Sequence, residues 1–292
     1  MPKSKDEAMH AIVTRVYEKA RKLFPDAGWW PALAWGMALA LLLAACACIP
    51  TAARAEVQPP AWQPAPGTSW QWQLQGQVDT SYDVDAYDVD GFDNDEATVG
   101  MIHARGSKAV CYISAGSWEA WRPDAPDFPD YVKGRNNGWP GEKWLDIRRT
   151  DVLEPIMGRR MDMCAAKGFD AVEPDNVDGY ANNSGFPLTY QDQLAYNRMI
   201  ARLAHDRGMA VGLKNDTDQV PDLVGDFDFA VVEECFRYKE CPAYSPFVEA
   251  GKAVLAAEYS TTNSVTKCDR ARQLRFSLIF KNRALGGGVG FC

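Results

Sequence analysis

Residues 150–175, TDVLEPIMGRRMDMCAAKGFDAVEPD, contain the structural unit that decides the fold. The apolar spacing over residues 150–167 predicts a helix, and Gly168 is the residue type that usually ends one. The short apolar run over residues 169–175 then predicts a buried strand that finishes on acidic residues. This stretch is therefore a helix followed by a strand with a polar end.

The same unit recurs along the chain. Residues 189–208 predict a second helix, in which Thr189 begins the helix in a capping-box-like arrangement and Gly208 ends it, and residues 209–215 follow as an apolar strand. Residues 252–259 follow Gly251 in the same way. Alternation of helices with continuously apolar strands predicts a parallel sheet covered by helices.

Eight strands are predicted in total. They cover Trp70–Leu74, Val84–Val89, Lys108–Ala115, 169–175, 209–215, Phe227–Glu233, 252–259 and Phe276–Lys281. An open doubly wound sheet would also suit the pattern, but no G-x-G-x-x-G follows an early strand. We therefore expect an α/β fold, a single-domain (β/α)8 TIM-type barrel over residues 69–292.

The N-terminal part has the features of an export segment. Residues 27–53 carry no charge, and basic residues precede them, as expected of a signal or anchor over residues 1–55. A lipobox-like Leu-Ala-Ala-Cys46 favours a lipid on Cys46, although an Ala-x-Ala cleavage site at Ala53–Ala55 or a retained anchor would also fit. Residues 56–68 contain four prolines and predict a stiff linker. The part of the chain after residue 55 is then expected to be exported to the cell envelope or outside the cell.

Six cysteines follow this segment, and an even number in an exported chain predicts disulfides. Six cysteines allow many pairings. Proximity favours Cys235 with Cys241 and Cys268 with Cys292, which leaves Cys111 with Cys164. Metal binding is the alternative, but neither a C-x-x-C motif nor a nearby histidine supports it.

The charge of the chain excludes one class of partner. The net charge is −8, and residues 1–55 hold seven basic and four acidic residues, so the remainder has 24 basic and 35 acidic residues, a charge of −11. A body this acidic argues against nucleic acid, because phosphate binding needs a basic face. It suits a cationic ligand, and it also suits an ordinary soluble surface.

Carboxylates gather where the predicted strands end, which is where barrels build their active sites. Two explanations are open: glycosidic cleavage by paired carboxylates, or a divalent-metal site. The aspartate-rich residues 79–95 lack the spacing of a calcium-binding EF-hand loop. The body has only His103 and His205, which disfavours metal hydrolysis and a Ser-His-Asp site, so we expect no metal and no cofactor. For any single acidic residue a structural role, such as a Glu233–Lys214 ion pair, remains open.

Several stretches resemble glycoside hydrolase family 114, the endo-α-1,4-polygalactosaminidase family. They are Tyr87-Asp-Val-Asp-Gly-Phe-Asp93, Val110-Cys-Tyr-Ile-Ser-Ala-Gly-Ser-Trp-Glu119, Trp144-Leu-Asp-Ile-Arg148, Gly168-Phe-Asp-Ala-Val-Glu-Pro-Asp-Asn-Val-Asp-Gly-Tyr180, Gly212-Leu-Lys-Asn-Asp216 and Glu233-Glu-Cys-Phe236.

The resemblance implies a (β/α)8-type barrel that hydrolyses α-1,4-linked galactosamine-containing polysaccharide, with Asp175 and Glu233 as the catalytic pair. One departure from the family pattern is Val232-Glu-Glu-Cys235 where Asn-Glu-Gln-Cys is expected, which puts the substrate contacts there in doubt. A partly deacetylated polymer is cationic and would suit the acidic body.

Other residues near the strand ends are expected to bind substrate. They are Asp88, Asp90, Asp93, Trp118, Glu119, Asn176, Asp178, Tyr180, Lys214, Asn215, Asp216, Glu258 and Tyr259. Trp121, Trp139 and Trp144 are further candidates for stacking on sugars. The rival hypotheses are a barrel that binds glycan without cleaving it, and a hydrolase of another amino-sugar α-glycan.

Overall fold

The computed structural model describes residues 62–260 and 264–292. Their main sheet has nine strands in the order β1-β2-β3-β7-β8-β9-β10-β11-β12. Eight of these strands are parallel, and they are the eight predicted from the sequence: β1 (Trp70–Gln73), β2 (Ala86–Asp90), β3 (Lys108–Ser114), β7 (Ala171–Asp175), β8 (Ala210–Lys214), β9 (Phe229–Glu233), β10 (Val254–Tyr259) and β11 (Ser277–Lys281). The short β12 (Gly290–Phe291) pairs antiparallel with β11.

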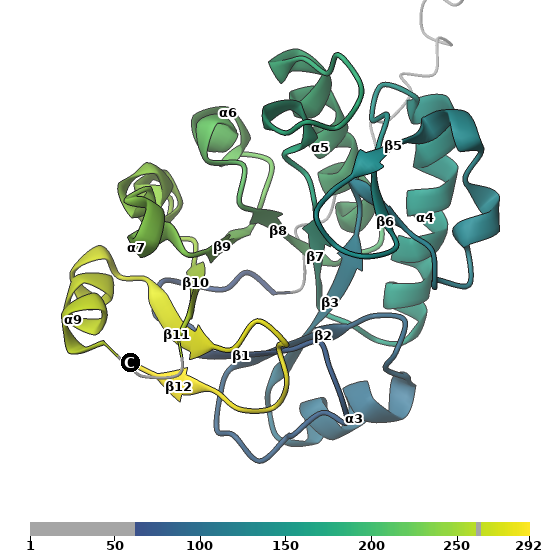
Figure 1. The fold of residues 1–292 in the computed structure, drawn as a ribbon. Coiled ribbons are helices and arrows are strands. Elements are labelled where there is room, and N and C mark those ends of the chain that lie inside the picture. The colour runs from purple at the N-terminus through teal and green to yellow at the C-terminus, as the bar shows by residue number, and fades with distance from the viewer. Residues whose placement is uncertain (1–61, 261–263) are drawn as a thin grey trace, which may run out of the picture. The chain divides into compact units, whose positions relative to one another are not determined.

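The sheet curls into a barrel whose first and last parallel strands lie side by side (Figure 1). Side chains join them: Lys281 Nζ donates to Gln71 Oε1 at 3.0 Å, and Trp70 Nε1 donates to the Ser277 carbonyl at 2.9 Å. The predicted (β/α)8-type architecture is confirmed, with β1 and β11 connected through side chains.

Helices connect most successive parallel strands and cover the outside of the sheet (Figure 1). They are α3 (Glu96–Ala104), α4 (Thr150–Ala166), α5 (Tyr190–His205), α6 (Val220–Leu223), α7 (Cys235–Tyr238), α8 (Ser245–Glu249) and α9 (Val265–Leu274), with 3-10 turns η1 (Ala125–Asp127), η2 (Asp130–Val132), η3 (Gly179–Ala181), η4 (Thr217–Gln219) and η5 (Cys241–Tyr244). The predicted capping box at the start of α5 is present, with Thr189 and Asp192 bonded reciprocally.

An unpredicted three-stranded antiparallel sheet lies between β3 and α4. It consists of β4 (Ser117–Glu119), β5 (Lys133–Asn136) and β6 (Glu142–Leu145). Its strands are short and the turn between β5 and β6 contains Asn, Gly and Pro, so no apolar period marks it in the sequence. This small sheet adds a wall to the face of the barrel where the strands end.

Alternate residues of each strand point into the barrel, and the character of these inward side chains changes with their depth. The deeper positions are apolar and include Ala86, Val110, Ala171 and Phe229. Gly212 of β8 must be a glycine, because an added Cβ would lie 2.5 Å from the Phe229 ring. Inward positions nearer the strand ends are polar or charged, so the barrel has an apolar floor beneath an ionic layer.

The start of the described chain packs against the N-terminal end of this barrel. The Trp62 ring lies 6.2 Å from that of Phe229, and the Pro64 carbonyl accepts a 2.8 Å hydrogen bond from the Ala253 amide. Residues 62–68 of the predicted linker therefore lie against the barrel. The predicted export segment, with Cys46, lies outside the described residues. Within residues 62–260 and 264–292, no helix has the length and apolar character that crossing a membrane requires.

All three predicted disulfides are present. Cys111 of β3 bonds Cys164 of α4, Cys235 bonds Cys241 next to the end of β9, and Cys268 of α9 bonds the terminal Cys292. They connect the barrel to its helices and fasten the C-terminus.

Candidate active site

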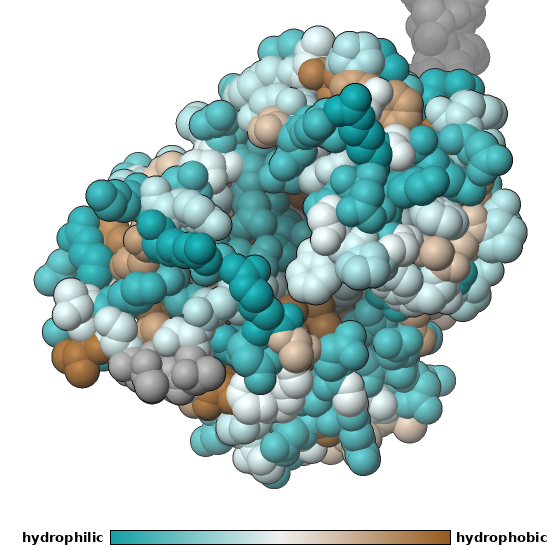
Figure 2. Space-filling model, viewed as in Figure 1, coloured by the Kyte–Doolittle hydropathy of each residue, from teal (hydrophilic) through white to brown (hydrophobic). Residues whose placement is uncertain are grey.

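A cavity of about 630 Å³ opens at the C-terminal ends of the parallel strands. Figure 2 shows it as a hollow lined by hydrophilic residues. Its lining comes from all eight parallel strands or the loops that follow them: Trp72, Leu74, Gln75, Asp90, Asp93, Tyr112, Glu119, Trp121, Arg122, Trp139, Pro140, Glu142, Trp144, Asp175, Asn176, Asp178, Asn182, Lys214, Asn215, Glu233, Tyr259, Arg283, Ala284 and Leu285.

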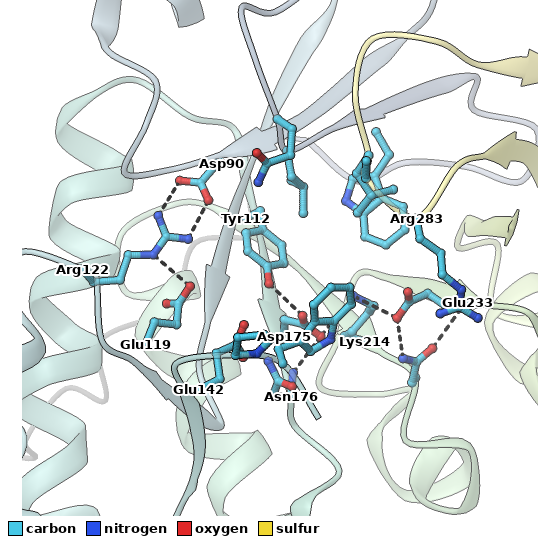
Figure 3. A pocket seen from close by; sticks show the side chains of 18 of the residues that line it. Asp90, Tyr112, Glu119, Arg122, Glu142, Asp175, Asn176, Lys214, Glu233 and Arg283 are labelled. Carbon is cyan, nitrogen blue, oxygen red and sulfur yellow. Dashed lines mark hydrogen bonds and ion pairs between the residues drawn. The ribbon is translucent and has the colours of Figure 1, made fainter. Parts of the chain in front are cut away.

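Asp175, the last residue of β7, is held by three hydrogen-bond donors. Tyr112 Oη donates to its Oδ2 at 2.8 Å, while Lys214 Nζ and the Asn176 amide donate to Oδ1 at 3.1 and 2.8 Å (Figure 3). Asn176 adopts a left-handed backbone (φ 63°), and its own side chain donates to Ser114 Oγ. Donors of this kind stabilise the ionised form of a carboxyl group.

Glu233, the last residue of β9, faces the same cavity. Its Oε2 accepts a 3.1 Å hydrogen bond from Asn215 Nδ2, and its Oε1 accepts one from Tyr259 Oη. Lys214 Nζ lies 3.5 Å from Oε2. Both predicted catalytic residues thus stand at strand ends and contact one ammonium group.

Lys214 is buried, with a side chain 2% exposed, although its Nζ reaches the cavity. The Nζ forms a third ion pair, 2.8 Å from Glu173 Oε1, and lies 4.8 Å from the centre of the Trp72 ring. Burial by itself would lower the pKa of Lys214, but the three surrounding carboxylates outweigh burial and raise that pKa well above its ordinary value. Lys214 is therefore a permanent cation between the two predicted catalytic carboxylates.

A pair of fully buried carboxyl groups lies deeper in the barrel. Glu173 Oε2 accepts a 3.1 Å hydrogen bond from Trp72 Nε1. Neither oxygen of Asp88 has a hydrogen-bond partner in the described part of the chain, and the Glu173 carboxyl is its charged neighbour. Burial and the negative Glu173 raise the pKa of Asp88 well above its ordinary value.

The opposite wall of the cavity is built around Arg122. Its guanidinium binds both oxygens of Asp90 at 2.9 and 2.6 Å and donates to Glu119 Oε1 at 2.9 Å (Figure 3). Burial raises the pKa of Glu119 to about 7, against the effect of the neighbouring arginines. This wall is rigid, because all three side chains are buried and mutually bonded.

A third acidic group stands beside the cavity near η3. Burial and the charge of Asp175 raise the pKa of Asp178 to about 6. Burial and the charge of Asp178 raise the pKa of Asp216 to about 8. The Asp216 side chain accepts a 2.8 Å hydrogen bond from Asn197 Nδ2 of α5.

The model of glycoside hydrolase family GH114 matches residues 51–292. The chain belongs to family GH114. It is 41% identical to Ega3 of Aspergillus fumigatus, whose crystal structure contains galactosamine, with a TM-score of 0.74 over 80% of this chain and 98% of that one. The predicted family is confirmed, and with it glycoside hydrolase activity. No curated protein matches the sequence.

More distant structures share the fold of this GH114 chain. The glycoside hydrolase domain of PelA from Pseudomonas aeruginosa has 14% identity and a TM-score of 0.59 over 74% of this chain and 94% of that one. An α-galactosidase from Thermus thermophilus has 14% identity and a TM-score of 0.51 over 75% of this chain and 59% of that one. At these identities the likeness concerns the barrel alone.

In this GH114 site, eight of the thirteen predicted substrate-binding residues line the cavity: Asp90, Asp93, Glu119, Asn176, Asp178, Lys214, Asn215 and Tyr259. The other five are absent from its lining: Asp88, Trp118, Tyr180, Asp216 and Glu258.

Those five side chains make other contacts. Asp88 is beneath the cavity, and Glu258 pairs with Lys267 of α9 on the outer side of β10. Trp118 donates to the Ala125 carbonyl, and Tyr180 packs edge-on against Tyr190, with ring centres 5.6 Å apart. Asp216 is bonded to α5, as described above.

Sequence reasoning passed over several residues that line the cavity, including Trp72, Tyr112, Arg122, Glu142, Asn182 and Arg283. Trp72 and Tyr112 stand at inward positions of β1 and β3, so strand alternation counted back from the acidic ends could have found them. Arg122 and Glu142 belong to the unpredicted insertion, for which no periodic signal exists.

Proposed function

We propose that this GH114 enzyme hydrolyses internal α-1,4 bonds of a galactosamine-containing polysaccharide, with Asp175 as nucleophile and Glu233 as acid and base. One observation carries the proposal: two carboxylates contact a single ammonium nitrogen, 3.1 and 3.5 Å away, at the base of an open cavity. The choice of sugar rests on the relationship to Ega3, whose structure contains galactosamine.

The same geometry supports retention of anomeric configuration. The nearest oxygens of Asp175 and Glu233 are no farther apart than their two distances to Nζ added together. That limit includes the ~5–5.5 Å separation of the carboxyl groups that is typical of retaining enzymes. A covalent glycosyl-enzyme intermediate is therefore part of the proposed mechanism.

The hydrogen-bond partners support the division of roles. Asp175 accepts three donors, one of them the ammonium at 3.1 Å, which favours the anion that a nucleophile requires. Glu233 also accepts hydrogen bonds, from Asn215 Nδ2 and Tyr259 Oη, but it lies farther from that ammonium, at 3.5 Å. It is therefore the better candidate for the carboxyl group that starts protonated and transfers its proton to the leaving oxygen.

The acidity of the cavity supports a cationic substrate. Asp93, Glu142 and Asp178 line it beside the catalytic pair, and the chain after residue 55 has a net charge of −11. Ammonium groups of unacetylated galactosamine would be attracted to this surface. Weakening of polymer binding by salt is the expected signature, because added ions screen charge–charge attraction.

We also propose that the protein acts outside the cytoplasm. Three disulfides are typical of exported proteins, and the sequence before residue 56 resembles an export signal. A lipid on Cys46 would hold the enzyme at the membrane, whereas cleavage after Ala55 would release it. Mass spectrometry of the mature N-terminus distinguishes the two.

Release of reducing ends from purified galactosamine polymer tests the proposal. Wild type is expected to shorten the polymer, while Asp175→Asn and Glu233→Gln lose nearly all activity. Asp130→Asn, which removes a carboxylate that does not line the cavity, is expected to behave as wild type. NMR of the first product should show the α-anomer. If wild type binds the polymer without shortening it, the hypothesis of a non-cleaving glycan-binding barrel is favoured. If wild type cleaves only another amino-sugar glycan, the protein is a hydrolase with a different substrate.

A further inference from the structure

We propose that Lys214 is a shared counter-ion whose ammonium group stabilises negative charge on Asp175 before the glycosidic bond breaks and on Glu233 afterwards. The inference rests on the proposed two-carboxylate mechanism. It goes further, because it assigns Lys214 a role in both chemical steps and none in holding the substrate.

The position of Lys214 Nζ carries the first part of the argument. It lies 3.1 Å from Asp175 Oδ1 and 3.5 Å from Glu233 Oε2. In the described part of the chain, Lys214 is the cation that forms an ion pair with each of these carboxylates. Its side chain is buried, which reduces the screening of its charge by bulk water.

The charge changes of a retaining reaction supply the second part. In the first step Asp175 attacks the anomeric carbon, the bond from that carbon to the leaving oxygen breaks, and this oxygen takes the proton of Glu233. Asp175 becomes a neutral ester and Glu233 an anion. In the second step water attacks the same carbon, Glu233 takes a proton from that water, and the ester bond breaks to restore the Asp175 anion. One negative charge thus alternates between two groups that both contact Lys214.

A fixed cation is needed for this role, and the layer below the cavity provides it. Glu173 pairs with Nζ at 2.8 Å and is itself held by Trp72 Nε1 at 3.1 Å. The Trp72 ring centre lies 4.8 Å from Nζ. Since Glu173 takes no part in the reaction, its contact with Lys214 persists while the catalytic charge moves. The ammonium therefore stays in place without reorganisation, which makes electrostatic stabilisation effective.

The competing explanation is that Lys214 is only the partner of a buried ion pair with Glu173. Removing one member of such a pair leaves an uncompensated charge and can unfold a protein. The double variant Lys214→Met with Glu173→Gln removes both charges together. Comparing it with Lys214→Met distinguishes the effect of losing the Lys214 charge from the effect of leaving the Glu173 charge unpaired.

The test is the pH dependence of kcat for polymer cleavage by wild type, Lys214→Met and the double variant. Without the cation both carboxyl groups hold their protons to higher pH, so both limbs of the profile are expected to move up by about one unit or more. We expect kcat to fall by roughly 10²–10³-fold. Lys281→Met is the control: it removes another buried lysine, one bonded to Gln71 and to the Gly286 carbonyl, and should leave the limbs in place.

Each outcome decides the question. The proposal is overturned if both Lys214 variants are folded and slower but keep the limbs of the wild-type pH profile. It is also overturned if they keep the wild-type kcat, and in either case Lys214 is structural. Where a variant is too slow for a profile, 13C NMR titration of the two carboxyl groups measures the same shift. Inactive wild type would contradict the proposed function, and this outcome is distinct from unshifted limbs in an active enzyme.

Discussion

Asn215 and Glu233 hold each other through two reciprocal hydrogen bonds. The Glu233 amide donates to Asn215 Oδ1 at 3.0 Å, and Asn215 Nδ2 donates to Glu233 Oε2 at 3.1 Å. Asn215 adopts a left-handed backbone (φ 51°), a conformation that asparagine tolerates better than most residues. The amide therefore fixes both the backbone and the carboxyl group of the proposed acid.

Replacing Asn215 by aspartate is expected to identify the acid. Asn215→Asp keeps an acceptor for the Glu233 amide but puts a negative charge beside its carboxyl group, which then retains its proton to higher pH. If Glu233 is the acid, the alkaline limb of the pH–activity profile moves up while the acidic limb stays. A shift of the acidic limb alone would instead make Glu233 the nucleophile. Asn182→Asp, which adds the same charge elsewhere in the cavity, is the matched control.

The buried Asp216 is expected to make stability depend on pH. Its pKa is raised to about 8 by burial and by Asp178, so the folded protein binds a proton there that the unfolded chain loses near pH 4. This contribution is complete below about pH 4 and is lost as the pH rises to about 8. Asp216→Asn should therefore reduce the fall in the free energy of unfolding between pH 5 and 8.5 by roughly 4 kcal/mol.

Urea unfolding at the two pH values measures this effect. Asp218→Asn, two residues along the same loop, is the control for removing a negative charge. An equal pH dependence in wild type and Asp216→Asn would show that Asp216 is ionised in the folded protein, contrary to the prediction.

The disulfides are expected to differ in their contribution to stability because they close loops of different length. Cys111–Cys164 spans 53 residues and Cys235–Cys241 spans 6. Chain entropy predicts a loss of about 4 kcal/mol for removing the first and about 2 kcal/mol for the second. Unfolding of the two double-alanine variants in urea compares them, and a larger loss from the short loop would contradict the loop-entropy argument. Because Cys235 lies two residues from Glu233, removing the Cys235–Cys241 disulfide should also lower kcat.

The barrel and both proposed catalytic residues could be predicted because each depends on local pattern. Eight apolar runs separated by helical segments predict parallel strands, and Asp175 and Glu233 end two of these runs. The same patterns do not predict how deep a side chain lies in the barrel or which side of its strand it faces. Asp88 and Asp90 point to the same side of β2, yet Asp88 lies one layer below the cavity. Glu258 and Tyr259 are adjacent and therefore point to opposite sides of β10.

The contacts that build the cavity walls depend on pairs far apart in the sequence. Arg122 bonds Asp90 across 32 residues, and Trp72 bonds Glu173 across 101. The sequence contains these residues but no signal that pairs them. The insertion carrying Trp121 and Trp139 has short strands and many turn residues, so its position over the cavity depends on tertiary packing alone.

Trp139 in that insertion is expected to bind the polymer by stacking. It lines the cavity and yet is 55% exposed, which is unusual for a large apolar side chain that serves only to pack the protein. Because Trp139 belongs to the insertion and not to the strand ends that carry the proposed catalytic carboxylates, Trp139→Ala should raise KM for polymer about five- to tenfold and change kcat little. The effect should be smaller for short oligosaccharides that do not reach the insertion.

Tyr131→Ala, which removes a similarly exposed aromatic ring outside the cavity lining, is the control and should leave KM unchanged. An equal change in KM for both variants, or a fall in kcat alone for Trp139→Ala, would show that the tryptophan supports the fold of the insertion and does not bind sugar.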